Sequence, residues 1–344
     1  MIEKKTLILT NVTGSTDVVN FAKWMGMSTQ NIDFEHYYYA HVNYKTSDYD
    51  RCIAFVDTGW EPSDELKQSI VRKCSILKDR GFTIVLGNLW ESTNQIKQTI
   101  HTELLSNVEY KIWDGGKTFF WYLMYDRYCN QQFNFDHSTK KFDFLYLNKM
   151  ERPHREKLFD SMQKANILNN SLVSYWQRNI HLAVEYELPW LNGELYPRYG
   201  RDRDIFEKPY NESAFNLVSE TSDTETFFTE KIWKPIVAGQ PFVVHGAKHC
   251  LKNLKDMGFM TFGDHFDENY DEVESNEKRV HKIVELCNSL IKIDPIEFYD
   301  ATRYIREHNT KHFFDPTSIK NAVDQEVSVL LELVDGSEIS SRES

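Results

Sequence analysis

Residues 215–246 read FNLVSETSDTETFFTEKIWKPIVAGQPFVVHG, a pattern of strand, polar loop, short helix and strand. Phe215–Ser219 and Pro241–His245 are short apolar runs of the kind that form buried parallel strands. Between them, Thr229 is placed to cap a helix whose apolar residues recur at helical spacing, and Gly239 suits the left-handed residue that ends it. Two such strands joined by a helix predict a parallel sheet with helices on its faces.

Polar residues follow the first of these strands and begin the helix. Glu220 comes directly after the strand, and Thr229, Glu230 and Lys231 stand at the helix start. Ligands of open parallel sheets bind beyond the carboxyl ends of strands, and a helix N-terminus favours anions. The pattern therefore predicts a site for a phosphorylated or sugar-like ligand. Carboxylates at a helix start also stabilise the helix dipole without a ligand, and Glu220 can either contact a sugar or order the loop.

The first half of the chain alternates between apolar runs and helix-like spacing, which predicts a parallel sheet covered by helices. We expect strands at Thr6–Val12, Cys52–Asp57, Phe82–Gly87 and Tyr110–Trp113. We expect helices at Asp17–Met25, Ser63–Arg80, Thr93–Leu105 and Phe119–Phe133.

The same alternation starts again after a polar joint at Asp136–Lys141. Besides the two strands already described, we expect strands at Lys141–Leu147, Leu172–Trp176 and Met260–Phe262. We expect helices at Pro153–Ala165, Leu251–Met257, Glu277–Leu290, Asp294–His308 and Ile319–Val334. The charged, proline-bearing stretch 185–212 is expected to be an irregular connection.

Two segments of the second half resemble the α1,3-fucosyltransferase family. In that family a strand ends in Phe-Glu-Asn, and a loop leads to an aromatic-hydrophobic-Thr-Glu-Lys helix; here VSE (218–220), FFTEKI (227–232) and PFVV (241–244) follow that order. The run FLYLNKMERPHREKLFDSM (144–162) resembles the family's first donor-domain strand, which ends in Asn and precedes an Arg-bearing helix. Thr221 departs from the family's Asn, which leaves the transferred sugar open.

The resemblance implies roles for individual residues. Arg155 is the implied pyrophosphate ligand, Glu230 is implied to bind the nucleotide ribose and Lys231 the diphosphate, while Phe227 borders the donor. From the residues alone, Arg155 also suits a solvated helix face and Phe227 also suits core packing. The predicted donor-binding residues are Asn148, Arg155, Glu220, Phe227, Thr229, Glu230 and Lys231.

The fold class implied is α/β, with two doubly wound Rossmann-like domains facing a cleft, the glycosyltransferase architecture called GT-B. We expect an acceptor-side domain at 1–139 and a nucleotide-sugar donor domain at 140–318. A C-terminal helix at 319–335 is expected to cross back onto the first domain, and 336–344 is expected to be a disordered tail.

Glycosyl transfer expels a nucleoside diphosphate, so fixed positive charge at the leaving group stabilises the transition state. Arg155, Lys231 and a helix N-terminus can supply that charge without a metal ion. We therefore expect an inverting, metal-independent glycosyltransferase without a cofactor, for which the resemblance suggests GDP-fucose as donor. The Asp-x-Asp runs at 48–50 and 202–204 match the metal-binding motif of other glycosyltransferases, but neither follows an apolar strand.

Inverting transfer needs a general base to accept the proton of the acceptor hydroxyl. Carboxylates in loops after strands of the first domain are the candidates, and we favour Asp57 or Glu61 over Glu91 and Asp17. The acceptor itself is open. A glycan or a lipid-linked sugar is the first expectation. The alternatives are a viral-type glycosyltransferase that acts on modified DNA bases and a non-catalytic module that only binds nucleotide sugars.

Composition limits the possible partners and the location. The formal net charge of −12 argues against a nucleic-acid backbone as the main partner, because phosphate contacts need a basic face. Five scattered cysteines without CxxC spacing favour a reducing, cytoplasmic setting. The apolar run near the N-terminus is too short for a signal peptide or a membrane span.

Overall fold

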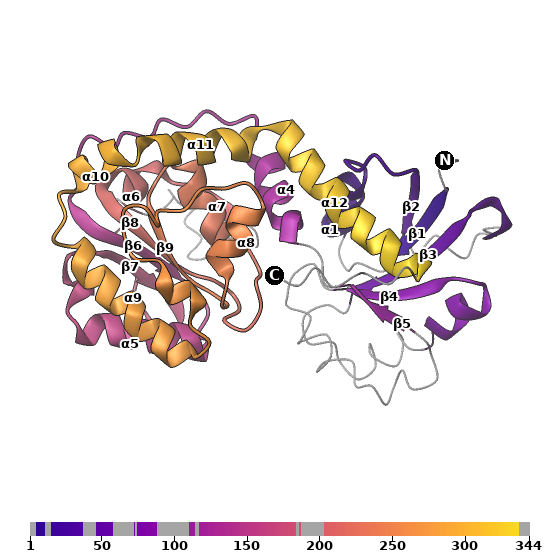
Figure 1. The fold of residues 1–344 in the computed structure, drawn as a ribbon, viewed down its shortest axis with the longest axis horizontal. Helices are drawn as coiled ribbons and strands as arrows, with labels where there is room; N and C mark the ends of the chain where they lie inside the picture. Colours follow the sequence, from indigo (N-terminus) through magenta and orange to yellow (C-terminus); the bar gives the residue numbers. More distant parts are fainter. Residues whose placement is uncertain are drawn as a thin grey trace. The chain divides into compact units, whose positions relative to one another are not determined.

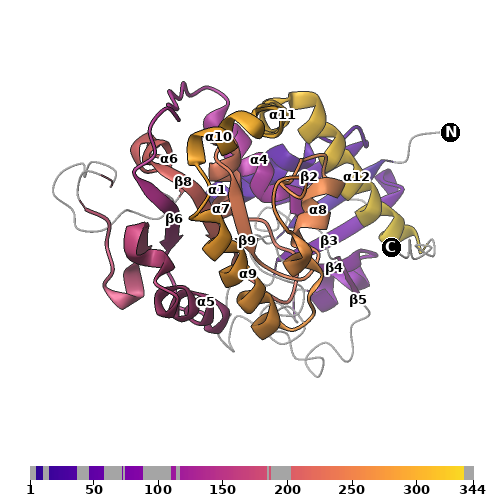
Figure 2. The same ribbon diagram turned by 60° about the vertical axis from the view of Figure 1, so that its left-hand side comes forward.

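The chain folds into two compact units, each of which contains one parallel sheet (Figures 1 and 2). The computed structural model describes residues 5–10, 15–36, 46–57, 72, 74–87, 110–113, 117–183, 186 and 203–336. The N-terminal unit spans Met1–Leu123 and Pro316–Ser344, and the C-terminal unit spans Met124–Asp315. The predicted α/β class, with a parallel sheet in each half of the chain, is confirmed.

The sheet of the N-terminal unit has five parallel strands in the order β2-β1-β3-β4-β5. Its central strands are apolar on both faces, and Leu7, Ile8 and Ile53 are fully buried, as expected for strands covered by helices. The strands are β1 (Thr6–Thr10), β2 (Ile32–His36), β3 (Arg51–Asp57), β4 (Thr83–Gly87) and β5 (Tyr110–Ile112). The helices of this unit are α1 (Ser15–Met25), the 3₁₀ turn η2 (Thr46–Asp48) and α12 (Pro316–Asp335), while α4 (Lys117–Tyr128) begins in this unit and ends in the C-terminal unit.

The long C-terminal helix α12 is fastened to the N-terminal unit by acidic side chains. The half-buried Glu326 carboxylate accepts hydrogen bonds from the backbone N–H groups of Lys117 (2.7 Å) and Thr118 (3.2 Å), and so caps the start of α4. Asp324 accepts a hydrogen bond from the backbone N–H of Thr29 at 2.9 Å. Val323, Val327 and Leu330 of α12 are fully buried, so the helix is part of this unit's core.

The sheet of the C-terminal unit has four parallel strands in the order β7-β6-β8-β9. The helices α5 and α9 pack against one another in this unit (Figure 1). Its strands are β6 (Phe142–Asn148), β7 (Leu172–Tyr175), β8 (Ser213–Ser219) and β9 (Phe242–His245). Its helices are α5 (Pro153–Lys164), α6 (Glu207–Glu212), α7 (Glu230–Val237), α8 (Cys250–Asp256), α9 (Asn276–Leu290), α10 (Pro295–Ala301) and α11 (Arg303–Phe314). Short 3₁₀ turns lie at η3 (Ile167–Asn170), η4 (Trp176–Arg178) and η7 (Asn269–Glu272).

Two predicted elements of the C-terminal unit are wrong. The predicted strand Met260–Phe262 is not a strand, because the Asn309 side chain hydrogen-bonds both the N–H and the carbonyl of Met260, at 2.8 and 2.9 Å. The single predicted helix Asp294–His308 is two helices that meet at Thr302, whose hydroxyl donates to the carbonyl of Phe298 at 2.7 Å.

The sequence patterns also missed the strand β2, which lies at the edge of its sheet, and the helix α6 at Glu207–Glu212, which lies in the stretch expected to be irregular. Most of the predicted helices Ser63–Arg80 and Thr93–Leu105 lies outside the described residues. Within the part of the chain that the structure describes, every helix is too short or too polar to cross a membrane.

Candidate functional site

The segment 219–231 lies at the carboxyl edge of the C-terminal sheet, between β8 and α7. Ser219 ends β8 beside His245, the last residue of β9. Thr229 then caps α7, with its hydroxyl oxygen 3.5 Å from the N–H of Lys231. α7 forms because Ile232, Trp233 and Ile236 share one buried face. The sheet and this helix therefore fix both ends of the loop that carries Glu220, Phe227 and Thr229.

The Glu220 carboxylate closes this loop on itself. Its Oε1 accepts a hydrogen bond from the Thr229 N–H at 3.2 Å and its Oε2 one from the Thr229 hydroxyl at 2.6 Å. Only 1% of Glu220 is exposed. Burial raises the pKa of Glu220, while the positive charge of Lys231 and the hydrogen bond from Thr229 oppose that rise. In this geometry Glu220 orders the loop and does not reach solvent.

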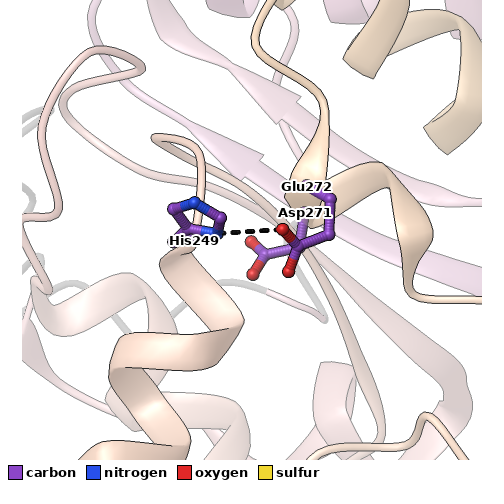
Figure 3. Close-up of side chains that lie close together, drawn as sticks. All are labelled: His249, Asp271 and Glu272. Atoms are coloured by element: carbon purple, nitrogen blue, oxygen red, sulfur yellow. Dashed lines mark ion pairs between the residues drawn. The ribbon is translucent and has the colours of Figure 1, made fainter. Parts of the chain in front are cut away.

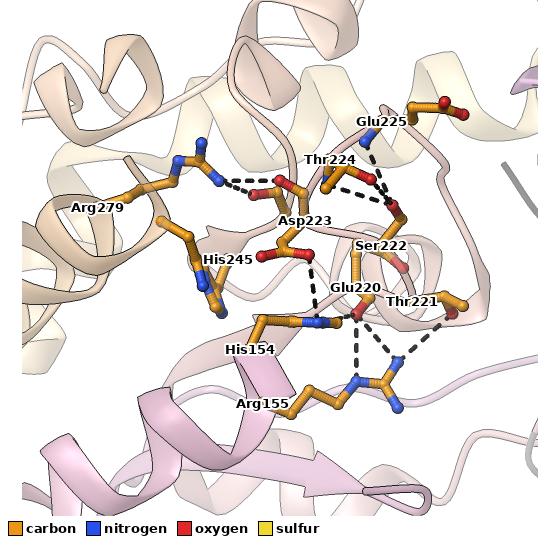
Figure 4. Close-up of polar contacts among 12 residues, drawn as sticks. His154, Arg155, Glu220, Thr221, Ser222, Asp223, Thr224, Glu225, His245 and Arg279 are labelled. Carbon is orange, nitrogen blue, oxygen red and sulfur yellow. Dashed lines mark hydrogen bonds and ion pairs between the residues drawn. The ribbon is translucent and has the colours of Figure 1, made fainter. Parts of the chain in front are cut away.

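The Arg155 guanidinium binds the same loop through its backbone (Figure 4). Its Nε and Nη2 donate to the carbonyl of Glu220 at 3.2 and 3.0 Å, and its Nη1 donates to the carbonyl of Met150 at 3.2 Å. Arg155 is 2% exposed, and burial lowers its pKa. It therefore lies inside the unit, although its neighbours Arg152, Glu156 and Lys157 in the sequence are charged. Because its N–H groups are hydrogen-bonded to backbone carbonyls, Arg155 stabilises the loop that begins at Glu220.

His154 strengthens the same contact. Its Nε2 donates to the carbonyl of Glu220 at 3.0 Å, and its Nδ1 lies 3.5 Å from an oxygen of Asp223. Burial lowers the pKa of His154 to about 4, so the ring is neutral at pH 7. Three donors thus converge on one carbonyl at the end of β8.

A second buried arginine, Arg279 on α9, binds the far side of the loop (Figure 4). Its Nη1 donates to the carbonyls of Gly246 (2.6 Å) and Asp223 (3.3 Å), and its Nε donates to the carbonyl of Val273 (3.1 Å). Arg279 is 2% exposed. Sequence reasoning missed this residue. The available signal was its position, because Arg279 lies on the apolar stripe of α9 that includes Ile283.

Glu230 and Lys231 form an ion pair at the start of α7. The Lys231 Nζ lies 2.7 Å from Glu230 Oε1 and donates to the Thr229 hydroxyl at 3.1 Å. Burial raises the pKa of Glu230, but the charges of Lys231 and Lys234 outweigh it and set this pKa at about 2. The side chains of Glu230 and Lys231 are 14% and 19% exposed, so solvent still reaches the pair. The pair therefore offers a permanent anion and a cation beside a helix N-terminus.

Two other predicted donor residues are buried. Asn148 ends β6, is 4% exposed and lies beside the Tyr146 hydroxyl. Phe227 is 6% exposed and lies within the packed part of the loop. The structure therefore brings Asn148, Arg155, Glu220 and Lys231 to one edge of the sheet, but it leaves only the Glu230–Lys231 pair accessible.

The predicted catalytic carboxylates are not placed by the structure. Asp57 is the last residue of β3, but its side chain lies outside the described residues, as do Glu61 and Glu91. In the Asp-x-Asp runs, Asp50 accepts a hydrogen bond from the N–H of Lys5 at 2.7 Å, and Asp204 is paired with Arg127. Those two carboxylates are thus already engaged within the protein.

Comparisons with known proteins gave matches among solved structures alone. No protein-family model matches this chain, and no curated protein sequence matches it. A structure titled "Crystal Structure of alpha1,3-Fucosyltransferase" is similar at 8% identity, covers 97% of this chain and 90% of that one, and has a TM-score of 0.48. A structure of alpha1,3-fucosyltransferase with GDP-fucose gives 9% identity, coverage of 98% and 92%, and a TM-score of 0.46. A structure of alpha1,3-fucosyltransferase with GDP gives 8% identity, coverage of 97% and 91%, and a TM-score of 0.43.

Proposed function

We propose that this chain is a glycosyltransferase that moves a sugar from a nucleoside diphosphate sugar to an acceptor hydroxyl, with inversion and without a metal ion in the transfer. The observation that supports this most is the Glu230–Lys231 pair at the N-terminus of α7, at the carboxyl edge of a parallel sheet. Ligands of such sheets bind at this edge, and helix N-termini favour phosphate. The motif resemblance suggests GDP-fucose as the first donor to test.

Each residue of the Glu230–Lys231 pair can exchange its contact with the other for a contact with the nucleotide-sugar donor. Lys231 is a point charge whose three N–H donors suit phosphate oxygens, and the N-terminus of α7 adds its partial positive charge. Glu230, with a pKa of about 2, stays ionised at every physiological pH and can accept hydrogen bonds from two ribose hydroxyls. When the donor binds, Lys231 contacts the diphosphate in place of Glu230. Glu230 then accepts hydrogen bonds from the ribose hydroxyls in place of Lys231.

Negative charge develops on the leaving diphosphate during the reaction. In this proposal Lys231 stabilises that charge. A fixed donor aimed at developing charge contributes about 3–4 kcal/mol to transition-state stabilisation. Arg155 contributes in a different way, because its N–H groups already bind the carbonyls of Glu220 and Met150. A direct contact of Arg155 with the pyrophosphate requires one of these hydrogen bonds to be exchanged for a phosphate oxygen.

In this proposal the N-terminal unit binds the acceptor and provides the general base. Asp57, at the end of β3, and Glu61 remain the proposed bases. The base removes the proton of the acceptor hydroxyl as its oxygen attacks the anomeric carbon, and the bond from that carbon to the diphosphate breaks on the opposite face. The anomeric configuration is inverted as a result.

A donor panel tests the proposal. Thermal unfolding is recorded with GDP, UDP, ADP and the corresponding nucleotide sugars, each with and without EDTA. A ligand that binds only the folded state raises the melting temperature. The proposal predicts a clear rise with one nucleotide family that EDTA does not change. No rise with any nucleotide would overturn the function, and a rise that EDTA abolishes would overturn metal independence.

Product analysis then separates an enzyme from a binding module. Nuclear magnetic resonance of the product made from the donor that binds, or of the sugar released from it, gives the anomeric configuration. The proposal predicts release of nucleoside diphosphate with inversion, and loss of turnover when Asp57 or Glu61 is replaced by the amide. Donor binding without any turnover would show that the chain is a nucleotide-sugar-binding module.

A further inference from the structure

Three side chains from two segments converge beside the N-terminus of α8. His249 lies in the turn that follows β9, while Asp271 and Glu272 lie at the end of η7 (Figure 3). One ligand atom from each of the three lies within 4.8 Å of the other two. The proposed donor site does not use any of them.

Backbone hydrogen bonds fix these two segments relative to one another. The His249 N–H donates to the carbonyl of Asp271 at 2.8 Å. The Asp271 carboxylate accepts from the Leu251 N–H (3.0 and 3.1 Å to its two oxygens) and from the Lys252 N–H (3.2 Å to Oδ2). A carboxylate has about four acceptor positions. Because Oδ1 accepts only one of these three contacts, it keeps an acceptor position.

The carboxylates of Asp271 and Glu272 lie close to one another and to the ring of His249. No lysine or arginine among the described residues lies within ion-pair distance of either carboxylate. The single ion-pair contact of Glu272 within that part of the chain is to Nδ1 of His249, at 3.3 Å.

Within the described residues, the His249 ring makes no hydrogen bond that explains its position. Its Nδ1 is buried, and the contact with Glu272 lacks hydrogen-bond geometry. Capping of α8 accounts for Asp271, whereas neither the Glu272 carboxylate nor the His249 ring takes part in it. Nδ1 of His249 and the carboxylates of Asp271 and Glu272 therefore face one another (Figure 3).

We propose that His249, Asp271 and Glu272 bind one divalent cation of the Zn²⁺ class. One imidazole nitrogen and two carboxylate oxygens are ligands that Zn²⁺ accepts, with water at the fourth position. Ligand atoms around tetrahedral Zn²⁺ lie about 3.4 Å apart. Glu272, with 62% of its side chain exposed, is free to move the short distance required. The cation would tie the turn after β9 to η7, and it takes no part in the transfer step.

Calorimetric titration of ZnCl₂ into the full chain, stripped of metal with EDTA and free of nucleotide, tests the site. Wild type is compared with His249→Gln and Glu272→Gln, while Asp271 is left intact because it caps α8. Each substitution removes one ligand, so we expect at least one Zn²⁺-binding event to weaken by more than about tenfold.

His281→Gln is the matched control. His281 and Glu285 on α9 form a pair with the same 3.3 Å separation, but both are exposed, and no third carboxylate from the part of the chain that the structure describes joins them. This variant is expected to bind Zn²⁺ as wild type does. An identical Zn²⁺ isotherm for wild type, His249→Gln and Glu272→Gln would overturn the proposal. Preference for Mg²⁺ or Ca²⁺ over Zn²⁺ would also overturn it, because imidazole suits Zn²⁺ and not these cations.

Thermal unfolding gives a second readout that does not depend on donor binding. Zn²⁺ is expected to raise the melting temperature of wild type and of His281→Gln, but not of His249→Gln. His249→Gln should still bind nucleoside diphosphate as wild type does. Failure of the cation site and failure of the proposed function are therefore distinguishable, since each leaves the other measurement unchanged. A melting temperature that responds to Zn²⁺ equally in wild type and His249→Gln would count against the site.

Discussion

The two units of the molecule use opposite charges for the same structural task. In the C-terminal unit, the guanidinium groups of Arg155 and Arg279 bind backbone carbonyls of the loop between β8 and α7. In the N-terminal unit, the carboxylates of Glu326 and Asp324 on α12 bind backbone N–H groups at the start of α4 and after α1. Both solutions satisfy polar groups that a helix or strand end leaves unpaired.

The choice of charge has consequences for function. An arginine remains charged at every pH that the protein meets, so it gives a loop at a ligand site a constant electrostatic environment. It also leaves positive charge beside a site proposed to receive a diphosphate. A carboxylate on α12 stabilises that helix equally well, but it can be protonated. The comparison therefore predicts that the two units respond differently to acid and to single substitutions.

Acid gives the largest expected effect, and it should act on the C-terminal unit first. Burial lowers the pKa of His137, His154 and His245 to about 4 each. Because the unfolded chain binds these protons near pH 6.5, stability is full above that pH and falls as the pH decreases towards 4. Each pKa unit corresponds to about 1.4 kcal/mol. Acid is therefore expected to lower the free energy of unfolding by up to about 3 kcal/mol for His154 and by a similar amount for His245.

The Asp324 contacts of the N-terminal unit should survive to lower pH. Burial raises the pKa of Asp324, but hydrogen bonds from Ser28 and Thr29 outweigh it and lower this pKa below its usual 3.8. The stability that Asp324 contributes is present above pH 3.8 and is lost as the pH falls through its lowered pKa. Hydrogen exchange from pH 7 to pH 4 measures both units. Earlier loss of protection in α12 than in α7 would contradict the comparison.

Replacement of Arg279 by alanine should destabilise the C-terminal unit by about 3 kcal/mol, because it removes the donor of the buried Gly246 carbonyl and of the part-buried Asp223 and Val273 carbonyls. The control is Arg303→Ala, which removes an exposed ion pair with Asp300 and should change stability by less than about 0.5 kcal/mol. Urea unfolding followed by circular dichroism measures both. Equal stability of the two variants would show that Arg279 does not stabilise the loop.

Replacement of Glu326 by alanine should cost the N-terminal unit about 2 kcal/mol, since the N–H groups of Lys117 and Thr118 lose their acceptor. Faster hydrogen exchange of these two amides, with unchanged exchange in α7, is the expected result. Glu285→Ala on the exposed face of α9 serves as the control. If the two amides exchange as in wild type, α12 is attached mainly by its apolar face.

Sequence patterns predicted the fold class and most elements because buried parallel strands are continuous apolar runs with helices between them. The strand β2 was not predicted because IDFEH alternates apolar and charged residues. An edge strand tolerates such alternation, whereas a central strand of a covered parallel sheet does not. The predicted strand Met260–Phe262 failed because a side chain distant in sequence, Asn309, took its backbone hydrogen bonds.

The site was predictable only in part, for a similar reason. The motif order placed Glu220, Glu230 and Lys231 at one edge of the sheet, which local sequence can indicate. The direction of a side chain depends on tertiary neighbours. Nothing in the sequence around Arg155 shows that it turns inward to the carbonyl of Glu220, and Arg279 lies some fifty residues beyond the loop that it binds.

The central claim is that Lys231 binds the diphosphate of a nucleotide donor. The most direct test is calorimetric titration, in EDTA, of the nucleoside diphosphate selected by the donor panel into wild type, Lys231→Ala and Lys157→Ala. Lys157 is an exposed lysine on α5 and serves as the control. We expect Lys231→Ala to weaken binding by more than about tenfold, or about 1.4 kcal/mol, while Lys157→Ala binds as wild type does. Equal affinity for wild type and Lys231→Ala would contradict it.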